Sequence, residues 1–455
     1  MLNVNIDNNR AKKLGTWLNE SNYSFIYQAM AGIFNSVEPW IDEQLICEMI
    51  KDVSENDKNL VEFLLLGYEK EKTVLNKIMG QENLQTIVDM GFAREEVGII
   101  KPEGYVILPV DKLFLIVSLP SCYKNAKKKM SDIYIGSDST KLMKYVKKEK
   151  YNKVLDLCAG SGVQGLNIAE IANKVTEVEL NEVAYSAAIL NGKINGYDES
   201  QYEVKNGDLY NCAEGEYDCI LSNPPFVPVP KDITFPLCGD GGEDGLDLVR
   251  KIVAGYDKHL KTSGKAYMVL ECIGDENRPY VVDCMKEVLV EGIINVSLIN
   301  RQQIEFQADA SAKIAIEIYN DPENYNRYYN AWMEMFKRTN AQYIYPVVVE
   351  YIKTSTPLEV NYIRNYNKWS LDSAFETRDD VEIKQSNHTY YGIFSGDVQK
   401  ATFDEEVKDL LTKCNGKNIR SYLQDNMEPK KYIMQIKSIL NTLHNLEMRG
   451  LISRK

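Results

Sequence analysis

The first part of the chain is patterned for helices. Between residues 21 and 92, apolar side chains recur three and four positions apart, as at Phe25, Ala29 and Ile33, which is the spacing of one buried helix face. The alternating run Val97–Leu108, with a turn at Lys101–Gly104, predicts a β-hairpin. Helices followed by a hairpin suggest a winged-helix-like module, so residues 1–130 are predicted to form an N-terminal recognition domain.

Short apolar strands alternate with amphipathic helices between residues 131 and 320. This alternation is typical of an α/β fold with a doubly wound, largely parallel sheet. Seven strands are predicted, the last two as antiparallel neighbours: Val154–Leu157, Val175–Leu180, Tyr202–Lys205, Tyr217–Ser222, Ala266–Glu271, Val296–Asn300 and Lys313–Tyr319. The predicted helices between them are Val163–Ile171, Val183–Asn195, Leu246–Leu260 and Tyr280–Val290.

Residues 321–455 have a different character and are predicted to form an α+β C-terminal extension. A tyrosine-rich helix is expected at Asn324–Lys337 and a β-rich run at Tyr343–Ile352. Helical spacing resumes at Glu405 and ends at Arg449-Gly450, where glycine is suited to close a helix. This tail again suggests a winged-helix-like unit.

Composition narrows the class of protein. With 455 residues the chain suits two or three domains, and 44% apolar with 26% charged residues is typical of a globular protein. The formal charge of -13 repels polyanions, which disfavours a general nucleic-acid coat protein. The lysine-rich connector at residues 124–150 is interpreted as a solvated face, with phosphate contact as the alternative.

Cysteine and histidine usage predicts neither disulfides nor a metal. The nine cysteines include no C-x-x-C pair, and the three histidines lie far apart, at His259, His388 and His444. We expect reduced thiols and no zinc site. The polar start lacks the apolar segment of a signal peptide, and no run approaches the roughly 20 apolar residues of a membrane span, so a cytoplasmic location without a membrane partner is expected.

Polar and glycine residues at the ends of the predicted central strands carry the candidate chemistry. The first strand breaks into the turn Cys158–Gly162, which suits a nucleotide-like cofactor. Glu179 ends the next strand, where a carboxylate can bond ribose hydroxyls, and Asp208 follows the third strand, where it can bond an adenine amine. The fourth strand ends in Asn223-Pro224-Pro225-Phe226. These positions meet at the edge where open α/β sheets bind ligands.

The Asn-Pro-Pro-Phe element suits chemistry on a planar nitrogen. An amide or aryl amine nitrogen is a weak nucleophile because its lone pair is delocalised. The Asn223 side-chain oxygen and the Pro224 carbonyl can each accept one N–H of such a group, which orients the nitrogen and stabilises charge developing on it. The prolines fix φ and remove competing donors, and Phe226 offers a flat face to the substrate.

These motifs resemble the class I S-adenosylmethionine-dependent methyltransferases, and most closely the HemK-type glutamine N-methyltransferases that modify release factors. The resemblance rests on the two motifs above and on Gly241–Leu246 followed by Arg250. It implies a Rossmann-like domain, S-adenosyl-L-methionine as cofactor and no metal. It also implies a catalytic set and a cofactor-binding set. The catalytic set is Asn223, Pro224 and Phe226; the cofactor set is Asp156, Cys158, Ala159, Gly160, Gly162, Glu179, Leu180, Asp208, Leu209 and Asn223.

Four features depart from the family pattern. Cys158 replaces the first glycine of the turn, and Phe226 replaces the more usual tyrosine. Residues 136–139, Gly-Ser-Asp-Ser, stand where a Pro-Arg-Pro segment is expected, and the C-terminal extension has no counterpart in the minimal enzyme. Glu243 and Asp244 suit a helix N-cap as well as a site.

The sequence leaves the methyl acceptor open. A primary amide of a protein or peptide is preferred. An exocyclic base amine of RNA or DNA is the alternative that the net charge disfavours, and a small-molecule or secondary-metabolite acceptor is a third. A catalytically silent binding scaffold is the non-enzyme alternative, against which the intact Asn223 motif argues. The oligomeric state is not predicted.

Overall fold

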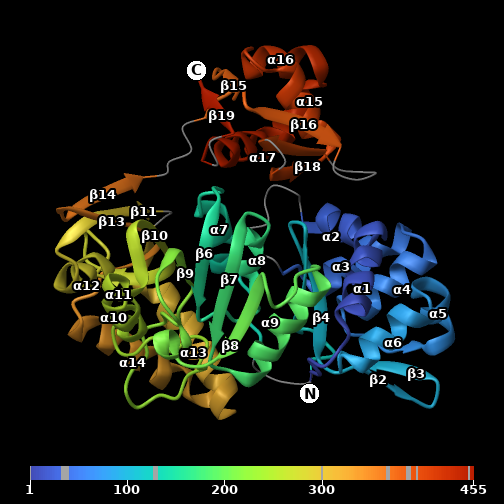
Figure 1. Ribbon diagram of the computed structural model, residues 1–455, viewed down its shortest axis with the longest axis horizontal. Helices are drawn as coiled ribbons and strands as arrows, with labels where there is room; N and C mark the ends of the chain where they lie inside the picture. Colours follow the sequence, from blue (N-terminus) through green and yellow to red (C-terminus); the bar gives the residue numbers. More distant parts are fainter. Residues whose placement is uncertain are drawn as a thin grey trace.

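A computed structural model describes residues 2–31, 40–126, 132–298, 301–364, 369–385, 391–395, 398–448 and 451–455 (Figure 1). Some predicted features lie outside these ranges, namely Ile33, Lys127–Lys129, the end of the Val296–Asn300 strand, His388 and Arg449-Gly450. Within the described part, no helix combines the length and the apolar character that a membrane crossing requires. Figure 1 shows the N-terminal elements in blue beside the central sheet, and the C-terminal elements as a separate orange to red group.

The central sheet has the strand order β14-β11-β13-β10-β9-β6-β7-β8, with the short β12 paired to β13. Strands β8, β7, β6, β9 and β10 run parallel, whereas β13 lies antiparallel between β10 and β11. The strands of this sheet are β6 Tyr151–Leu157, β7 Ala172–Glu179, β8 Tyr202–Asn206, β9 Tyr217–Ser222, β10 Leu260–Gly274, β11 Glu291–Leu298, β12 Gln302–Gln303, β13 Tyr343–Pro357 and β14 Glu359–Arg364.

Both faces of the sheet are buried, as a doubly wound fold requires. Successive residues of β6 and β9 enter different hydrophobic clusters: Val154 and Cys219 belong to one, Leu155 and Ile220 to the other. Because strand side chains alternate between faces, this places a core on each side. The helices associated with the sheet are α7 Ser137–Tyr145, α8 Val163–Ala169, α9 Glu182–Ile194, α10 Asp247–Ala254, α11 Tyr256–His259, α12 Val281–Val288, α13 Ile304–Tyr319 and α14 Tyr325–Arg338.

One predicted strand is wrong, and it moves the edge of the sheet. Lys313–Tyr319 forms the second half of helix α13 and not a strand. Its alternating isoleucines suggested a strand, but Ala308, Ala312 and Ala315 lie at helical spacing and are fully buried against Trp332 and its neighbours. The missing strand is β13, so the sheet extends past the predicted domain limit at residue 320.

The N-terminal part has the element order of a winged-helix module. Helix α4 is followed by β1, α5, α6, β2 and β3, and the three strands pair in the order β1-β3-β2. The predicted single hairpin is instead two, β2–β3 and β4–β5, because the chain turns at Val97-Gly98 and again between β4 and β5. The elements are α1 Asn8–Glu20, α2 Tyr23–Ala31, α3 Glu43–Met49, the 3₁₀ turn Ile50–Asp52, α4 Glu55–Leu64, β1 Lys70–Glu71, α5 Lys72–Met79, α6 Gln81–Asp89, β2 Ala93–Glu96, β3 Ile99–Pro102, β4 Tyr105–Val110 and β5 Leu113–Ser118.

Helix α6, the position that a winged-helix protein uses for recognition, is covered by α1. Lys13 Nζ lies 2.7 Å from Glu82 Oε2, and Arg10 Nη2 lies 2.7 Å from Asp89 Oδ2. The polar side of α6 is therefore acidic and already paired. This arrangement disfavours nucleic-acid contact through α6.

Helix α9 joins the N-terminal part to the central sheet. The Asn195 side chain accepts from the N–H of Phe114 and donates to its carbonyl, and Asn191 does the same with Ile116. These two amides continue the hydrogen bonding of β5 in place of another strand. The Asn191 amide also donates to the Ser161 carbonyl, 2.9 Å away. Asn191 therefore connects the N-terminal part with the turn after β6.

The C-terminal residues 369–455 have a hydrophobic core of their own around Phe375, Phe403 and Leu443. Strand β15 pairs with β19 at the end of the chain, and β16, β17 and β18 form an antiparallel sheet. The elements are β15 Phe375–Thr377, β16 Val381–Gln385, β17 Tyr391–Ser395, β18 Val398–Phe403, α15 Glu405–Lys413, α16 Ile419–Asn426, α17 Pro429–Met448 and β19 Ile452–Arg454.

Candidate active site

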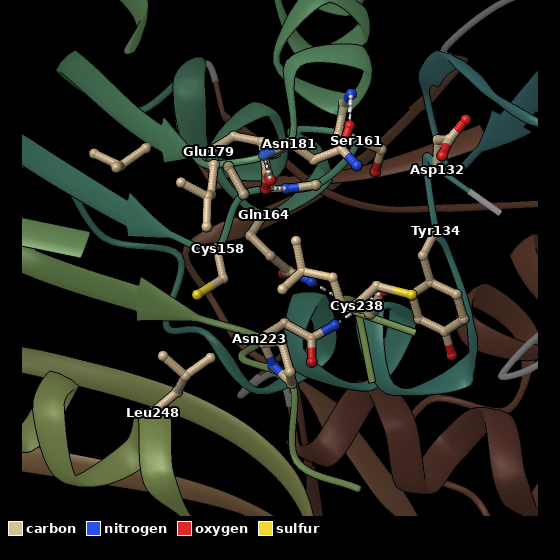
Figure 2. A pocket seen from close by; sticks show the side chains of 18 of the residues that line it. Asp132, Tyr134, Cys158, Ser161, Gln164, Glu179, Asn181, Asn223, Cys238 and Leu248 are labelled. Atoms are coloured by element: carbon tan, nitrogen blue, oxygen red, sulfur yellow. Dashed lines mark hydrogen bonds between the residues drawn. The ribbon is translucent and has the colours of Figure 1, made fainter. Parts of the chain in front are cut away.

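A cavity of about 220 Å³ lies at the carboxyl ends of β6, β7, β8 and β9 (Figure 2). Its wall is formed by the residues that follow each of these strands. The order of the sheet reverses between β6 and β9, and such a switch point is where open α/β sheets bind ligands. The wall also includes residues 132, 134 and 139 before and within α7, and residues 236–238 of the loop after β9.

Most of the predicted cofactor residues lie in the wall, and four predicted site residues do not. Lining residues from the predicted set are Cys158, Ala159, Gly160, Glu179, Leu180, Asp208, Leu209 and Asn223. Asp156 is buried beneath the turn. Gly162 faces the Tyr202 hydroxyl, and a Cβ atom at residue 162 would lie only 2.2 Å from the hydroxyl oxygen. Pro225 lines the cavity where Pro224 was expected, and Phe226 packs against the apolar cluster under α10.

The turn after β6 uses its N–H groups internally. Glu179 Oε2 accepts from the Gly160 N–H and Glu179 Oε1 from the Asn181 N–H, both at 2.7 Å. The Gly165 N–H, at the start of α8, donates to Asp156 Oδ2 at 3.1 Å. Protein carboxylates therefore occupy donors that a phosphate would need, so the turn does not form a phosphate cradle.

Cys158 is a structural residue of this turn. Its φ is +58°, the left-handed region that glycine adopts most easily. Burial raises the pKa of the Cys158 thiol well above its usual value, and Glu179 and Asp156 raise it further. A thiolate is disfavoured at this position, which argues against Cys158 as a nucleophile.

Buried carboxyl groups lie beneath the turn. Burial raises the pKa of Asp156 to about 8, partly offset by the Gly165 N–H. Burial also raises the pKa of Glu177 well above its usual value, with the nearby Asp156 adding to the effect. Neutral carboxyls are therefore favoured below the cavity floor.

The side-chain amide of Asn223 has a fixed orientation. Its Nδ2 donates to Asp138 Oδ2 at 2.6 Å and to Ser139 Oγ at 3.2 Å. A carboxylate only accepts hydrogen bonds, so the NH2 group must face Asp138 and the oxygen must face away. Asn223 Oδ1 is buried and has no hydrogen-bond partner within the described residues.

Asp138, Ser139 and Gln164 were not predicted as site residues. Asp138 is buried and also accepts from the Tyr134 hydroxyl at 2.8 Å. Gln164, on the first turn of α8, lines the cavity and donates from Nε2 to the Ser139 carbonyl at 2.9 Å. The available signal was position: residues 136–139 replace the expected Pro-Arg-Pro segment, whereas Gln164 shares its helix face with the polar Asn167 and gave no signal of its own.

The acidic segment after β9 is a structural element. The Asp244 carboxylate accepts from the Leu246 N–H at 3.0 Å, just before α10, and forms an ion pair with Arg250. Glu243 pairs with Arg338 at 2.6 Å and Lys231 at 3.4 Å. Neither carboxylate lines the cavity. The helix-capping interpretation is wrong, because Leu246 is the N-cap of α10 and no side chain of the described residues caps this helix; the two carboxylates instead hold the loop by ion pairs and by the hydrogen bond to the Leu246 N–H.

Two lysines of the connector are also engaged within the protein. Lys141 lies 3.7 Å from Glu271, and Lys147 lies 2.9 Å from Glu350. The described part of the connector thus gives no support to phosphate contact by these side chains.

The cavity wall is acidic. Asp132, Glu179 and Asp208 line it, and among the lining residues in the described ranges there is no lysine, arginine or histidine. S-adenosylmethionine carries a sulfonium, an ammonium and one carboxylate, so its net charge is positive. Such a wall suits this cofactor and would repel a pyrophosphate-containing nucleotide.

Comparison with known proteins agrees with this geometry. Residues 130–279 match the family model described as the methyltransferase small domain. This segment is a class I methyltransferase domain. It holds every residue that lines the cavity, and S-adenosyl-L-methionine is the cofactor of such domains.

The relatives of the methyltransferase domain include glutamine methyltransferases. The release factor glutamine methyltransferase of Clostridium acetobutylicum is 36% identical over 138 residues, which are 27% of this chain and 48% of the relative. The ribosomal protein uL3 glutamine methyltransferase of Francisella tularensis is 35% identical over 123 residues, 24% of this chain and 38% of the relative. The match thus spans less than half the length of either relative.

Among solved structures, a ribosomal protein L11 methylase from Lactobacillus delbrueckii is 16% identical with a TM-score of 0.25, and the superposition covers 34% of this chain and 65% of that one.

Proposed function

We propose that this chain transfers the methyl group of S-adenosylmethionine to a planar nitrogen, and that the acceptor is a primary amide of a protein. The observation that carries the reaction type is the oriented amide of Asn223: the residue lines the cavity, and its side-chain oxygen has no hydrogen-bond partner within the described residues. The acceptor class is supported by the relatives, which are named as glutamine methyltransferases of a release factor and of ribosomal protein uL3.

The side chain of Asn223 performs the positioning. Its Oδ1 accepts one N–H of the acceptor –NH2 and holds the nitrogen in a single direction. As methyl transfer proceeds, positive charge develops on that nitrogen and the hydrogen bond to Oδ1 strengthens. The cofactor supplies an activated methyl group when bound. The protein therefore needs only to orient the acceptor nitrogen and to stabilise the positive charge that develops on it.

The negative charge next to Asn223 adds to this effect. The buried Asp138 carboxylate accepts from Nδ2 of Asn223 and polarises the amide, which makes Oδ1 a stronger acceptor. Burial makes this electrostatic contribution larger than it would be in water.

The proposal is tested in two steps. Titration calorimetry first measures S-adenosylhomocysteine binding to the wild type and to Asn223→Ala. Tritiated methyl transfer is then followed with purified release factor, ribosomal protein and total RNA as separate acceptors. We expect near-normal binding in the variant and a rate about 100- to 1000-fold lower, the range for one lost oriented group.

Three results would contradict the proposal. Absence of binding to the wild type would exclude the cofactor. An unchanged rate in Asn223→Ala would exclude the positioning role. Label in RNA with none in protein would exclude the amide acceptor and favour a base amine.

A further inference from the structure

Gln164 is a second oriented amide in the same cavity. It is 3% exposed, lies in the cavity wall, and its Oε1 has no hydrogen-bond partner within the described residues. Its Nε2 donates to the Ser139 carbonyl, which only accepts, so Nε2 must face Ser139 and Oε1 must face away. A buried acceptor without a partner is costly, which indicates that a ligand donor completes it.

The neighbouring contacts locate this acceptor within the cavity. Asn223 and Gln164 both donate to Ser139, one to its hydroxyl and one to its carbonyl. Figure 2 shows the amide ends of Gln164 and Asn223 converging on the same part of the wall. Gln164 therefore belongs to the same end of the cavity as Asn223, where the methyl group must be delivered.

Two kinds of N–H donor must meet at this end. One is the –NH2 of the acceptor, which Asn223 serves in the proposed function. The other is the α-ammonium of the methionyl part of the cofactor, since this part is attached to the same sulfur as the methyl group. A neutral amide oxygen is suited to an ammonium in an acidic wall whose described residues include no lysine or arginine.

We propose that Gln164 Oε1 binds the methionyl ammonium of S-adenosylmethionine. This inference rests on the proposed function for its cofactor. It assigns to Gln164 a binding role that neither the glycine turn nor the Asn-Pro-Pro-Phe element supplies. Ser139 then serves both side chains. Its carbonyl fixes the orientation of Gln164, which binds the cofactor, and its hydroxyl helps to orient Asn223, which binds the acceptor.

The test compares two ligands that differ at the methionyl end. S-adenosylhomocysteine carries the ammonium, whereas 5′-methylthioadenosine lacks the whole amino-acid group. Titration calorimetry measures both with the wild type and with Gln164→Met, which keeps the length of the side chain and removes its polar atoms. We expect S-adenosylhomocysteine to bind about 10- to 100-fold more weakly to the variant, the range for a hydrogen bond to a charged group. The affinity for 5′-methylthioadenosine should not change.

Asn167 provides a matched control on the same helix. Its Nδ2 donates to the Met143 carbonyl of α7 at 3.2 Å, as Gln164 donates to Ser139, but Asn167 does not line the cavity. Asn167→Leu therefore removes an equivalent contact between α8 and α7 and should leave both affinities unchanged.

Three outcomes would overturn the inference. Equal weakening of both ligands in Gln164→Met would show a structural role. Unchanged S-adenosylhomocysteine affinity, with a raised KM for the acceptor, would assign Oε1 to the acceptor nitrogen. An effect of Asn167→Leu as large as that of Gln164→Met would show that the junction of the two helices is responsible. If the wild type bound neither ligand, the proposed function itself would fail, which is a distinct result.

Discussion

The substitution Asp138→Asn tests how the orientation of Asn223 is enforced. In the wild type both Asp138 oxygens are acceptors, one for Asn223 Nδ2 at 2.6 Å and one for the Tyr134 hydroxyl at 2.8 Å. An asparagine at residue 138 replaces one acceptor by a donor. It also converts a charge-assisted hydrogen bond into a neutral one, which is worth about 1 to 1.5 kcal/mol less.

That difference predicts about a tenfold lower rate of methyl transfer, since 1.4 kcal/mol corresponds to a factor of ten. Asp138→Ala should lower the rate further, because the remaining Ser139 hydroxyl can donate or accept and no longer selects one orientation of Asn223. Asp138 does not line the cavity, so S-adenosylhomocysteine affinity should stay within about twofold of the wild type.

The assay is the initial rate of tritiated methyl transfer to purified release factor, combined with calorimetry of the same protein preparations. A rate in Asp138→Asn equal to the wild type would refute the orientation argument. Equal losses of rate and of S-adenosylhomocysteine affinity would show instead that the substitution damages the cofactor site.

Three further predictions concern stability, each measured by chemical denaturation. Gly15→Ala should destabilise the protein by about 1 to 3 kcal/mol, because the alanine Cβ would lie 1.9 Å from the Ile194 carbonyl oxygen where α1 crosses α9. An unchanged midpoint of denaturation would contradict this close packing of the two helices. Trp332→Ala should cost about 3 to 5 kcal/mol, since the ring is fully buried and its Nε1 donates to the Pro228 carbonyl; a cost below 1 kcal/mol would refute it. Burial raises the pKa of Asp156 from 3.8 to about 8, so the folded state binds its proton more tightly and this contribution to stability declines as pH rises through that window. The stability of Asp156→Asn relative to the wild type should therefore improve between pH 5 and pH 8, and a difference independent of pH would exclude the effect.

The sequence predicted the part of the fold whose pattern is local. Strands β6 to β9 have apolar runs that end in glycine, acidic or proline residues, and each was placed within a few residues of its observed bounds. Strand β13 was assigned to another domain because the predicted helix Asn324–Lys337 separates it from the predicted central strands, and only its pairing with β10 and β11 brings it into the sheet. Strand pairing over such a distance leaves no local signal.

The site residues also divide into those that a local sequence pattern marks and those that depend on long-range contacts. Motif positions at strand ends, such as Glu179 and Asn223, could be placed because strand order brings them together. Asp138 and Gln164 act through side-chain hydrogen bonds between α7, α8 and the loop after β9, and nothing in their local sequence specifies these contacts. Phe226 is half-buried and packs against the apolar cluster under α10, and its contact with a substrate stays a prediction.

The most direct test of the account is the identity of the atom that receives the methyl group. Release factor is incubated with the enzyme and ¹³C-methyl-labelled S-adenosylmethionine, and the product is studied by tandem mass spectrometry and by NMR of the labelled carbon. We expect one labelled methyl on the side-chain amide nitrogen of a glutamine, formed about 100- to 1000-fold more slowly with Asn223→Ala. Label on an oxygen, a sulfur or a carbon atom, or label that forms at the wild-type rate in Asn223→Ala, would contradict this assignment.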